Sequence, residues 1–248
     1  MSLGTQGSRQ RGTIILSPHA DDAALSIGGM LCKNALEEPV TLVTIFGRSN
    51  YLRESAFQSD WEFVTATRKS EDVAFADSLG IKLQYLEFPE ASLRLGSSYD
   101  KIFSKEIQTE DQFPPDLITV INQIVDSESP KLLFAPLGLG LHRDHLIACR
   151  LPHKITKPGA TVVVYYEDLP YAAYVAEYEI LRHASFVSPS LTPTYVSIDS
   201  ELPNKLANLM LYQSQISEFE LGIVKYYASR WKQGRLYERV WVSRADSS

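Results

Sequence analysis

Several features are scarce in this sequence, and each absence excludes a class of protein. Its 248 residues contain two cysteines, Cys32 and Cys149, and neither belongs to a C-x-x-C pair. A disulfide framework and a thiolate zinc motif are therefore excluded, and this cysteine usage suits a reducing cytoplasm. Because no apolar run approaches the length of a membrane span, we expect a cytoplasmic protein without one.

The charge pattern excludes a further class of partner. The sequence has 24 basic and 30 acidic residues, mixed along the chain, for a net charge of −6. No basic run suggests a nucleic-acid groove, so we expect no nucleic-acid partner. With 44% hydrophobic residues, the chain can bury a substantial core without a disulfide or a structural metal. A bound metal would therefore serve chemistry rather than folding.

The chain shows no internal repeat, low-complexity tract or linker that would divide it. Residues 1–12 are polar and glycine-rich, without an apolar signal core, and predict a disordered tail. The remaining residues, 13–248, have the length of one large domain. We expect a single folded unit over that range.

Apolar runs alternate with helical patterns through the first two thirds of the chain. Strands are predicted at residues 13–17, 40–46, 83–88, 131–135 and 160–166, and helices at 21–35, 61–79, 115–126 and 145–151. This alternation predicts an α/β fold with a mostly parallel sheet covered by helices on both faces. A further amphipathic helix is expected around residues 202–213 and a last strand at 239–243. The long segments 47–60 and 89–114 are typical of binding loops.

Two polar motifs follow predicted strands. His19, Asp21 and Asp22 come directly after the first strand, and His142-Arg143-Asp144-His145 follows the fourth. Ligands of open α/β sheets bind at the carboxyl ends of the strands. Adjacent aspartates beside a histidine favour a cation between them, since the carboxylates otherwise repel each other. If the two strands are neighbours, both motifs line one crevice.

These residues supply the parts for metal-assisted amide hydrolysis. Two histidines and one aspartate can bind zinc and leave the fourth position open, as in catalytic sites. A remaining carboxylate can take a proton from the attacking water, and a remaining histidine can stabilise the oxyanion or protonate the leaving amine. The alternative is ordinary: a paired aspartate is often a solvated helix cap, and His-x-x-His is often a surface pair.

With these motifs the chain resembles the LmbE-like (PIG-L) N-deacetylases, which are zinc enzymes with a Rossmann-like three-layer sandwich. That family has a His-Pro-Asp-Asp motif after its first strand and His-x-Asp-His after its fourth, matched here by residues 19–22 and 142–145. Gly28-Gly29 and the segment 68–80, with Arg68, Glu71 and Leu79-Gly80, also match. The resemblance covers residues 13–151 well and places the active site at the carboxyl ends of the strands.

The resemblance assigns roles to individual residues. It implies that His19, Asp22 and His145 bind zinc, or another divalent ion, and that Asp21 is the general base for a metal-bound water that attacks the amide carbonyl. It implies that His142 stabilises the oxyanion or acts as the general acid. Arg68 would bind substrate, although a helical ion pair with Glu71 is an equal alternative. Asp144 is expected to orient a histidine from behind.

Two positions depart from the family, and one segment is ambiguous. Ala20 replaces a proline without removing a ligand, and Gly140 stands where some members have a tyrosine that donates to the oxyanion. Glu167 and Asp168 follow the fifth strand; they could contact a sugar hydroxyl or a zinc-ligand histidine, but an ordinary polar turn before Pro170 is favoured.

The expected function is therefore the removal of an N-acetyl group from a small amino-sugar conjugate, such as an N-acetylglucosamine conjugate. The resemblance is also compatible with a homo-oligomer. One alternative is a metal- or carbohydrate-binding protein of the same fold without turnover. Another is a nucleotide-binding module, which only Gly138-Leu139-Gly140 supports, since the full G-x-G-x-x-G pattern is missing.

Overall fold

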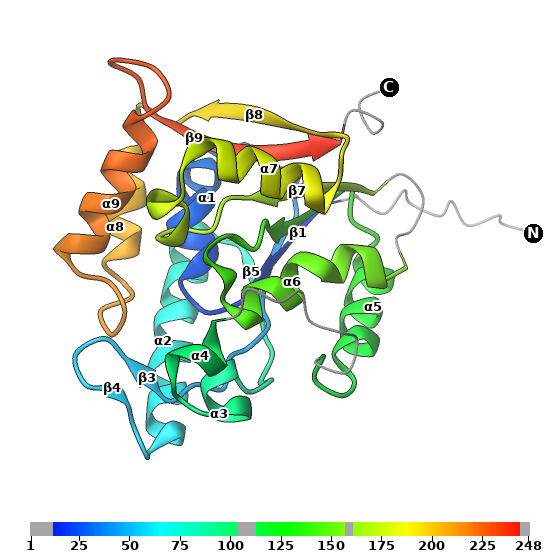
Figure 1. The fold of residues 1–248 in the computed structure, drawn as a ribbon, viewed down its shortest axis with the longest axis vertical. Coiled ribbons are helices and arrows are strands. Elements are labelled where there is room, and N and C mark those ends of the chain that lie inside the picture. The colour runs from blue at the N-terminus through cyan, green and yellow to red at the C-terminus, as the bar shows by residue number, and fades with distance from the viewer. Residues whose placement is uncertain (1–11, 104–112, 157–160, 244–248) are drawn as a thin grey trace, which may run out of the picture.

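The computed structural model of the protein describes residues 12–103, 113–156 and 161–243. In these ranges the centre of the molecule is a seven-stranded sheet in the order β5-β2-β1-β6-β7-β9-β8 (Figure 1). Its strands are β1 (Thr13–Ser17), β2 (Val40–Thr44), β5 (Lys82–Tyr85), β6 (Leu132–Pro136), β7 (Val162–Tyr166), β8 (Leu191–Ser197) and β9 (Tyr237–Ser243). The first five are mutually parallel, whereas β9 pairs antiparallel with β7 and β8.

Helices cover both sides of the sheet, so the predicted mostly parallel α/β fold is confirmed (Figure 1). They are α1 (Asp22–Cys32), α2 (Trp61–Leu79), α3 (Ala91–Leu95), α4 (Tyr99–Ile102), α5 (Leu117–Glu128), α6 (Arg143–Lys154), α7 (Glu177–Val187), α8 (Leu202–Leu209) and α9 (Glu218–Ser229). Short 3₁₀ turns, η2 (Leu139–Leu141) and η3 (Tyr171–Tyr174), precede α6 and α7.

Local sequence explains where several elements begin and end. All five residues of β1 are buried, as expected for an apolar strand with neighbours on both sides. Helix α2 begins at Asp60, whose carboxylate accepts a hydrogen bond from the Phe63 amide at 3.0 Å. It ends at Gly80, where φ is +65° and only glycine is free of strain. These two signals fix the helix that carries Arg68.

The sequence predicted the first half of the fold better than the second. The predicted helix at 202–213 is present as α8 and the last strand as β9, each with shifted ends. The segment 47–60 contains the small β3–β4 hairpin (Tyr51–Leu52 and Ala56–Phe57), and 89–114 contains α3, α4 and residues outside the described ranges. Strand β8 was not predicted; its Pro193 would be unfavourable in a central strand and is tolerated here because β8 lies at the sheet edge.

Strand order decides where the polar motifs meet. β1 lies between β2 and β6, with Ile15 paired to Phe134, so the segments after β1 and β6 leave the same sheet edge side by side. The segment after β7 leaves that edge next to them. The condition set by the sequence, that the first and fourth strands be neighbours, is therefore met.

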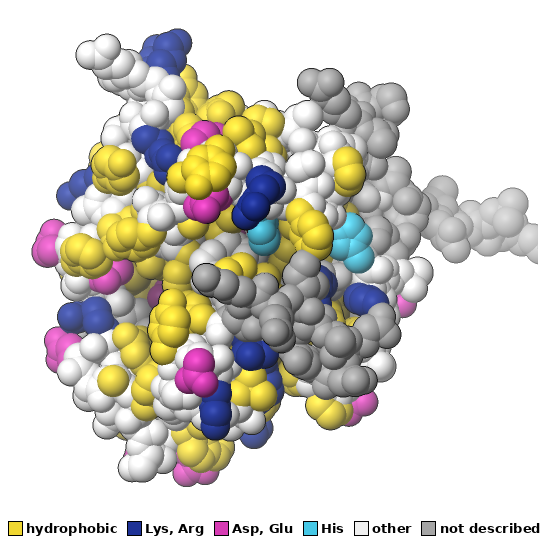
Figure 2. Space-filling view, in the orientation of Figure 1, with side chains coloured by type: hydrophobic (Ala, Val, Ile, Leu, Met, Phe, Trp, Pro, Cys, Tyr) yellow, Lys and Arg dark blue, Asp and Glu magenta, His cyan; other side chains and the backbone are white. Residues whose placement is uncertain are grey.

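The expected N-terminal tail concerns residues that mostly precede the described ranges. Residues 1–11 of the expected tail lie outside the described residues, and the single domain at 13–248 stays a prediction. Of the helices in the described ranges, none is both long and apolar enough to cross a bilayer. Basic and acidic side chains are mixed on the face shown in Figure 2, in agreement with the mixed charges of the sequence.

Candidate metal centre and active site

A cavity of about 290 Å³ lies at the carboxyl edge of the parallel strands. Five of the predicted site residues line it: His19, Asp21, Asp22, Arg68 and His142. His145 lies behind them and is fully buried. A larger, mostly apolar cavity of about 610 Å³ contains none of the predicted site side chains. The smaller cavity is therefore the one that the predicted site residues line.

Three of these side chains form a compact group suited to a metal ion. One ligand atom each from His19, Asp22 and His145 lies within 4.8 Å of the other two, and all three residues are buried. Asp22 Oδ2 is 3.0 Å from His19 Nδ1 and 3.2 Å from His145 Nε2. This is the set that the family resemblance implied, and the fold brings it together from segments more than 120 residues apart.

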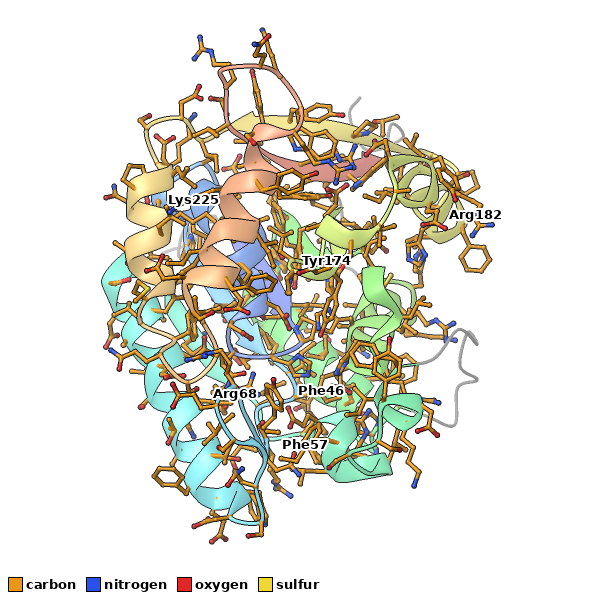
Figure 3. The ribbon with its side chains drawn as sticks, turned by 60° about the vertical axis from the view of Figure 1, so that its left-hand side comes forward. Phe46, Phe57, Arg68, Tyr174, Arg182 and Lys225 are labelled. Atoms are coloured by element: carbon orange, nitrogen blue, oxygen red, sulfur yellow. The ribbon has the colours of Figure 1, made fainter. Side chains whose placement is uncertain are left out.

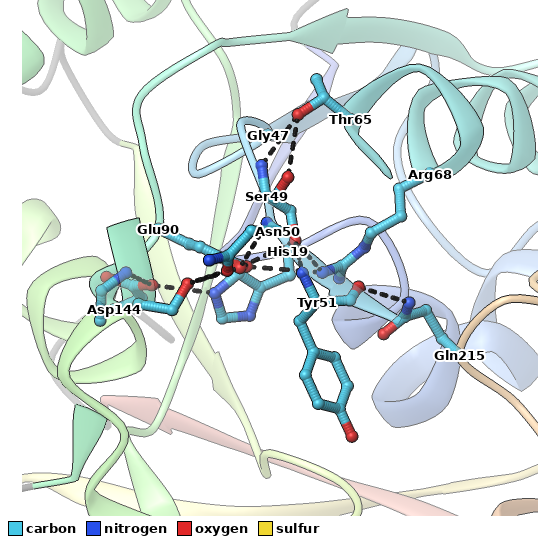
Figure 4. Close-up of polar contacts among 12 residues, drawn as sticks. His19, Gly47, Ser49, Asn50, Tyr51, Thr65, Arg68, Glu90, Asp144 and Gln215 are labelled. Carbon is cyan, nitrogen blue, oxygen red and sulfur yellow. Dashed lines mark hydrogen bonds and ion pairs between the residues drawn. The ribbon is translucent and has the colours of Figure 1, made fainter. Parts of the chain in front are cut away.

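The second nitrogen of each imidazole is held by a buried carboxylate. His19 Nε2 lies 3.0 Å from Asp144 Oδ2, a contact drawn in Figure 4, and His145 Nδ1 lies 2.7 Å from Asp168 Oδ1. Both carboxylates are fully buried. Carboxylates in this position fix the tautomer and orientation of metal-ligating histidines. The arrangement leaves His19 Nδ1 and His145 Nε2 facing Asp22.

The atoms of a second group fit a metal less well. His19, His142 and Asp144 also converge within 4.8 Å. However, Asp144 already accepts hydrogen bonds from the Ala91 amide and the Arg94 guanidinium, both at 2.8 Å. His142 Nδ1 accepts one from the Asp144 amide at 3.2 Å. The group of His19, Asp22 and His145 therefore has the freer atoms.

His145 provides the strongest sign that a ligand belongs in this group. Its Nε2 is buried and makes no hydrogen bond with any described residue, although Asp22 Oδ2 is 3.2 Å away. A buried polar atom without a partner costs about 1–3 kcal/mol, and such atoms are rare unless an ion or water satisfies them. Two imidazole nitrogens and one carboxylate oxygen suit zinc with an open fourth position. The residues present therefore fit the metal that the sequence predicted.

The electrostatics of the group favour a cation. Burial by itself lowers the pKa of His19, but the carboxylates of Asp144 and Asp22 outweigh it and raise that pKa to about 9. Asp22 and Asp168 outweigh burial in the same way and raise the pKa of His145 to about 10. The negative charge that stabilises two imidazolium ions would equally stabilise a divalent ion in their place.

His142 differs from the other two histidines. Burial and the nearby rings of His19 and His145 hold its pKa well below the usual range, so the ring is neutral. Because Nδ1 accepts the hydrogen bond from the Asp144 amide, the proton of the neutral ring resides on Nε2. His142 therefore presents a hydrogen-bond donor on a ring that also lines the cavity.

Asp21 is not the solvated helix cap of the ordinary interpretation. It is the N-cap residue of α1, but its side chain accepts no capping hydrogen bond. The carboxylate lies 3.6 Å from the guanidinium of Arg68 and lines the cavity. Burial and the neighbouring Asp22 raise its pKa, which makes it a better proton acceptor.

Arg68 points toward the cavity rather than along the surface of its helix. Its guanidinium donates to Ser49 Oγ at 2.8 Å and lies 3.4 Å from Glu90 Oε2 (Figure 4). Glu71, the alternative partner, instead accepts two hydrogen bonds from Ser214, at 2.7 Å from its amide and 2.6 Å from its hydroxyl. The geometry therefore favours the substrate-facing alternative for Arg68.

The sequence favours an ordinary polar turn at Asp168, but its carboxylate contacts His145. Besides His145, its carboxylate accepts hydrogen bonds from the amides of Gly138 at 2.8 Å and Leu139 at 3.0 Å. Two backbone donors that a nucleotide phosphate would need in this loop are thus occupied, which argues against the nucleotide-binding alternative. The signal that could have identified Asp168 was its place directly after a third neighbouring strand.

The rest of that segment has a packing role. Glu167 is buried and accepts hydrogen bonds from Arg239, Tyr227 and Trp241, at 2.6, 2.5 and 2.8 Å. Gly140, the position of the absent family tyrosine, has a φ of +80°, and a Cβ there would lie 2.4 Å from Tyr171 Cβ. The Tyr171 ring fills this space and meets the His145 ring edge to face at 5.2 Å.

Comparison with known proteins supports this account. The sequence pattern of the family described as GlcNAc-PI de-N-acetylase (PIG-L) matches residues 14–155, which is more than half of the chain. The chain is 28% identical over 215 residues to 2'-N-acetylparomamine deacetylase of Streptomyces fradiae, covering 85% of this chain and 75% of that protein.

Solved structures share the fold. The zinc-inhibited form of teicoplanin deacetylase superposes with a TM-score of 0.68 at 21% identity, covering 93% of this chain and 97% of the other. N,N'-diacetylchitobiose deacetylase from Pyrococcus horikoshii gives a TM-score of 0.66 at 17% identity, covering 97% and 87%. These relatives are named deacetylases, which are amide hydrolases. The predicted family and enzyme class are thus confirmed, and the chain belongs to the PIG-L family of GlcNAc-PI de-N-acetylases.

Proposed function

We propose that this protein is a zinc-dependent hydrolase that removes the N-acetyl group of an amino-sugar conjugate, with the metal held by His19, Asp22 and His145. The observation that carries the proposal is the buried Nε2 of His145, which has no hydrogen-bond partner among the described residues and faces the Asp22 carboxylate. Another divalent ion could occupy the same ligands, because affinity order alone does not select zinc.

When bound, the metal would polarise the amide carbonyl and lower the pKa of water. The residues around it suit the remaining tasks. Asp21 would accept the proton of the water that attacks the carbonyl carbon. His142 would donate a hydrogen bond from Nε2 to the carbonyl oxygen as charge develops there, and would protonate the leaving nitrogen. Asp144 would hold His19 in orientation, and Arg68 would contact the substrate.

The substrate class rests on the relatives together with the cavity. The named relatives act on N-acetylated paromamine and on N,N'-diacetylchitobiose, both amino-sugar conjugates. A volume of about 290 Å³ is at the lower end for small-molecule sites, which suits one sugar ring with part of its neighbour. Action in the cytoplasm and assembly into a homo-oligomer stay predictions of the sequence.

Replacing Asp21 by asparagine tests the mechanism. The variant keeps the ligand set, so it should bind zinc in the same stoichiometry while kcat falls about 10²- to 10⁴-fold. Zinc content by mass spectrometry and acetate release from N,N'-diacetylchitobiose measure the two quantities. Asp77→Asn, at an exposed position on α2, is the matched loss of one carboxylate and should keep full activity.

Two results would contradict the proposal. Full turnover by Asp21→Asn would remove the general base from the mechanism. Zinc binding without turnover of any N-acetylated sugar by the wild-type protein would instead support the alternative of a binding protein of the same fold.

A further inference from the structure

One side of the cavity is built by the β3–β4 hairpin together with the start of α9. Tyr51 and Phe57 of the β3–β4 hairpin line it together with Gln215, Ile216 and Glu220 from the start of α9 and the segment before it. We call these five residues the acceptor wall. The last three lie beyond residue 155, where the match to the family pattern ends.

Hydrogen bonds join the two parts of the acceptor wall. The Arg53 amide donates to the Ser214 carbonyl at 3.0 Å, and Gln215 Nε2 donates to the Tyr51 carbonyl at 3.2 Å (Figure 4). The rings of Tyr51 and Phe57 pack with centroids 5.4 Å apart. Phe57 and Arg68, both labelled in Figure 3, line the same cavity. The hairpin and the segment before α9 thus form one surface.

Gln215 and Glu220 present oxygen acceptors on this surface, and the Tyr51 hydroxyl can accept or donate. The amide nitrogen of Gln215 is used on the Tyr51 carbonyl and on both oxygens of Ser214, so its Oε1 remains. Oε2 of Glu220 accepts hydrogen bonds from the Ser217 amide at 2.8 Å and the Ser217 hydroxyl at 2.5 Å, so its Oε1 remains. A carboxylate oxygen, an amide oxygen and two aromatic rings are the groups that bind an ammonium ion.

The charges around the cavity also favour a cationic ligand. Of the described Lys and Arg side chains, only Arg68 lines it, and that guanidinium lies beside Glu90 and Asp21. Glu220 adds a further carboxylate to the lining that is not a proposed metal ligand. A phosphate or carboxylate on the substrate would meet Glu220 without a cation to balance it, and this repulsion selects against anionic conjugates.

We propose that the acceptor wall recognises a protonated amine on the substrate, so that the preferred substrate is a cationic amino-sugar conjugate that carries a free ammonium group besides its N-acetyl group. This inference rests on the proposed deacetylase function and specifies its substrate class. Glu220 is the residue that would set the preference for charge.

N,N'-diacetylchitobiose and its two mono-N-acetyl isomers test the inference, because each isomer differs from the diacetyl compound in one acetyl group only. N,N'-diacetylchitobiose is neutral, whereas either mono-N-acetyl isomer has one amine, which is protonated in mildly acidic buffer. For the wild-type enzyme we expect a kcat/KM at least about 10-fold higher for one mono-acetyl isomer, mainly through KM, given the strength of hydrogen bonds to charged groups. Added salt should reduce the difference.

Glu220→Gln should abolish this preference, so that kcat/KM for the cationic isomer falls to the value for the neutral disaccharide. Glutamine can keep the capping box with Ser217, so the start of α9 should stay intact, which thermal unfolding checks. Glu218→Gln removes a charge from the exposed first position of the same helix and should keep the preference. Equal kcat/KM values for neutral and cationic substrates in the wild type would overturn the inference while the deacetylase function stood.

Failure of the deacetylase function would look different. If the zinc-loaded wild type hydrolysed none of these compounds, calorimetry with the fully deacetylated, dicationic disaccharide would still test the wall. Binding about 10-fold weaker in Glu220→Gln than in Glu218→Gln supports the inference. Equal binding by both variants, or none by the wild type, overturns it.

Discussion

The metal centre and the acceptor wall border the same cavity but are built differently. The metal centre comes from segments that leave three adjacent parallel strands, and Asp144, His145 and Asp168 are fully buried. The acceptor wall comes from a hairpin with two-residue strands and from the segment before α9, and Phe57 is 38% exposed. Under the proposed function, the reacting groups would lie among fully buried side chains, and part of the substrate-selecting surface would lie on an exposed hairpin.

The match to the family pattern covers the two regions unequally. The residues of the metal centre up to His145 fall within the matched residues 14–155, whereas Gln215 and Glu220 fall outside them. We therefore expect substitutions in the metal centre to abolish activity on every substrate. Substitutions in the acceptor wall should change the ranking of substrates.

Loss of a metal ligand is the most severe test of this comparison. His145→Ala should lose zinc and reduce kcat/KM by about 10³-fold or more on neutral and cationic substrates alike, because a bound metal supplies several kcal/mol of transition-state stabilisation. Zinc analysis and acetate release measure both losses.

His153→Ala is the matched control, since it removes a histidine from the same helix without touching the metal group. His153 lies beside the Tyr165 hydroxyl at 3.0 Å, and its loss should leave zinc content unchanged. A His145→Ala protein with a full zinc complement would show that the metal is bound elsewhere.

The sequence predicted the metal centre because its information there is local. Each motif lies within a few residues of the end of an apolar run, so residues 19–22 and 142–145 could be assigned to strand ends, and parallel pairing places such ends together. The acceptor wall could not be predicted in this way. Tyr51 meets Gln215 through a pairing of distant loops, and no periodic pattern encodes that contact.

Asp168 shows the limit between these two cases. Its position after β7 was visible in the sequence and a zinc-ligand histidine was one possible partner, but a polar turn was favoured because an aspartate before a Leu-Pro pair is typical of one. Only the order β1-β6-β7 in the sheet brings it to His145. Sheet order, rather than any local signal, decided its role.

The packing of α2 against the segment that leads to the acceptor wall can be tested through the pH dependence of the protein's stability. Asp72 on α2 accepts hydrogen bonds from Thr44 of β2 at 2.5 Å and from Tyr212, three residues before Gln215 of the wall, at 2.7 Å. Burial raises the pKa of Asp72 to about 7 from 3.8. The folded protein therefore holds a proton that the unfolded chain releases above about pH 4. The stabilisation from this group is complete below that pH and is lost as the pH rises through 7.

Asp72→Asn should remove this component of stability. The difference in unfolding free energy between the variant and the wild type should change by roughly 4 kcal/mol between pH 4 and pH 8, in favour of the variant at high pH. Urea unfolding at both pH values measures it, and pH effects at the metal centre cancel in the difference. Parallel curves for the two proteins would contradict the assignment, and zinc content should be the same in both.

The smallest of these effects is expected at Asp168, and it tests how far the metal centre extends. Its carboxylate lies 2.7 Å from His145 Nδ1 and is fixed by two backbone amides, so it both orients the ring and increases the electron density at Nε2. Asparagine keeps an oxygen acceptor but loses the charge. Asp168→Asn should therefore weaken zinc binding about 10- to 100-fold without removing a ligand.

Competition with a zinc chelator measures this affinity, and activity at saturating zinc should largely recover, which separates it from His145→Ala. Asp126→Asn, at an exposed position on α5, removes the same charge from the protein and should leave the affinity unchanged. If Asp168→Asn binds zinc as tightly as the wild type, the metal centre ends at its three ligands and Asp168 serves only the loop of Gly138 and Leu139. If the zinc affinity falls as expected and activity at limiting zinc falls equally on both substrate classes, the third strand belongs to the metal centre and the acceptor wall stays separate from it.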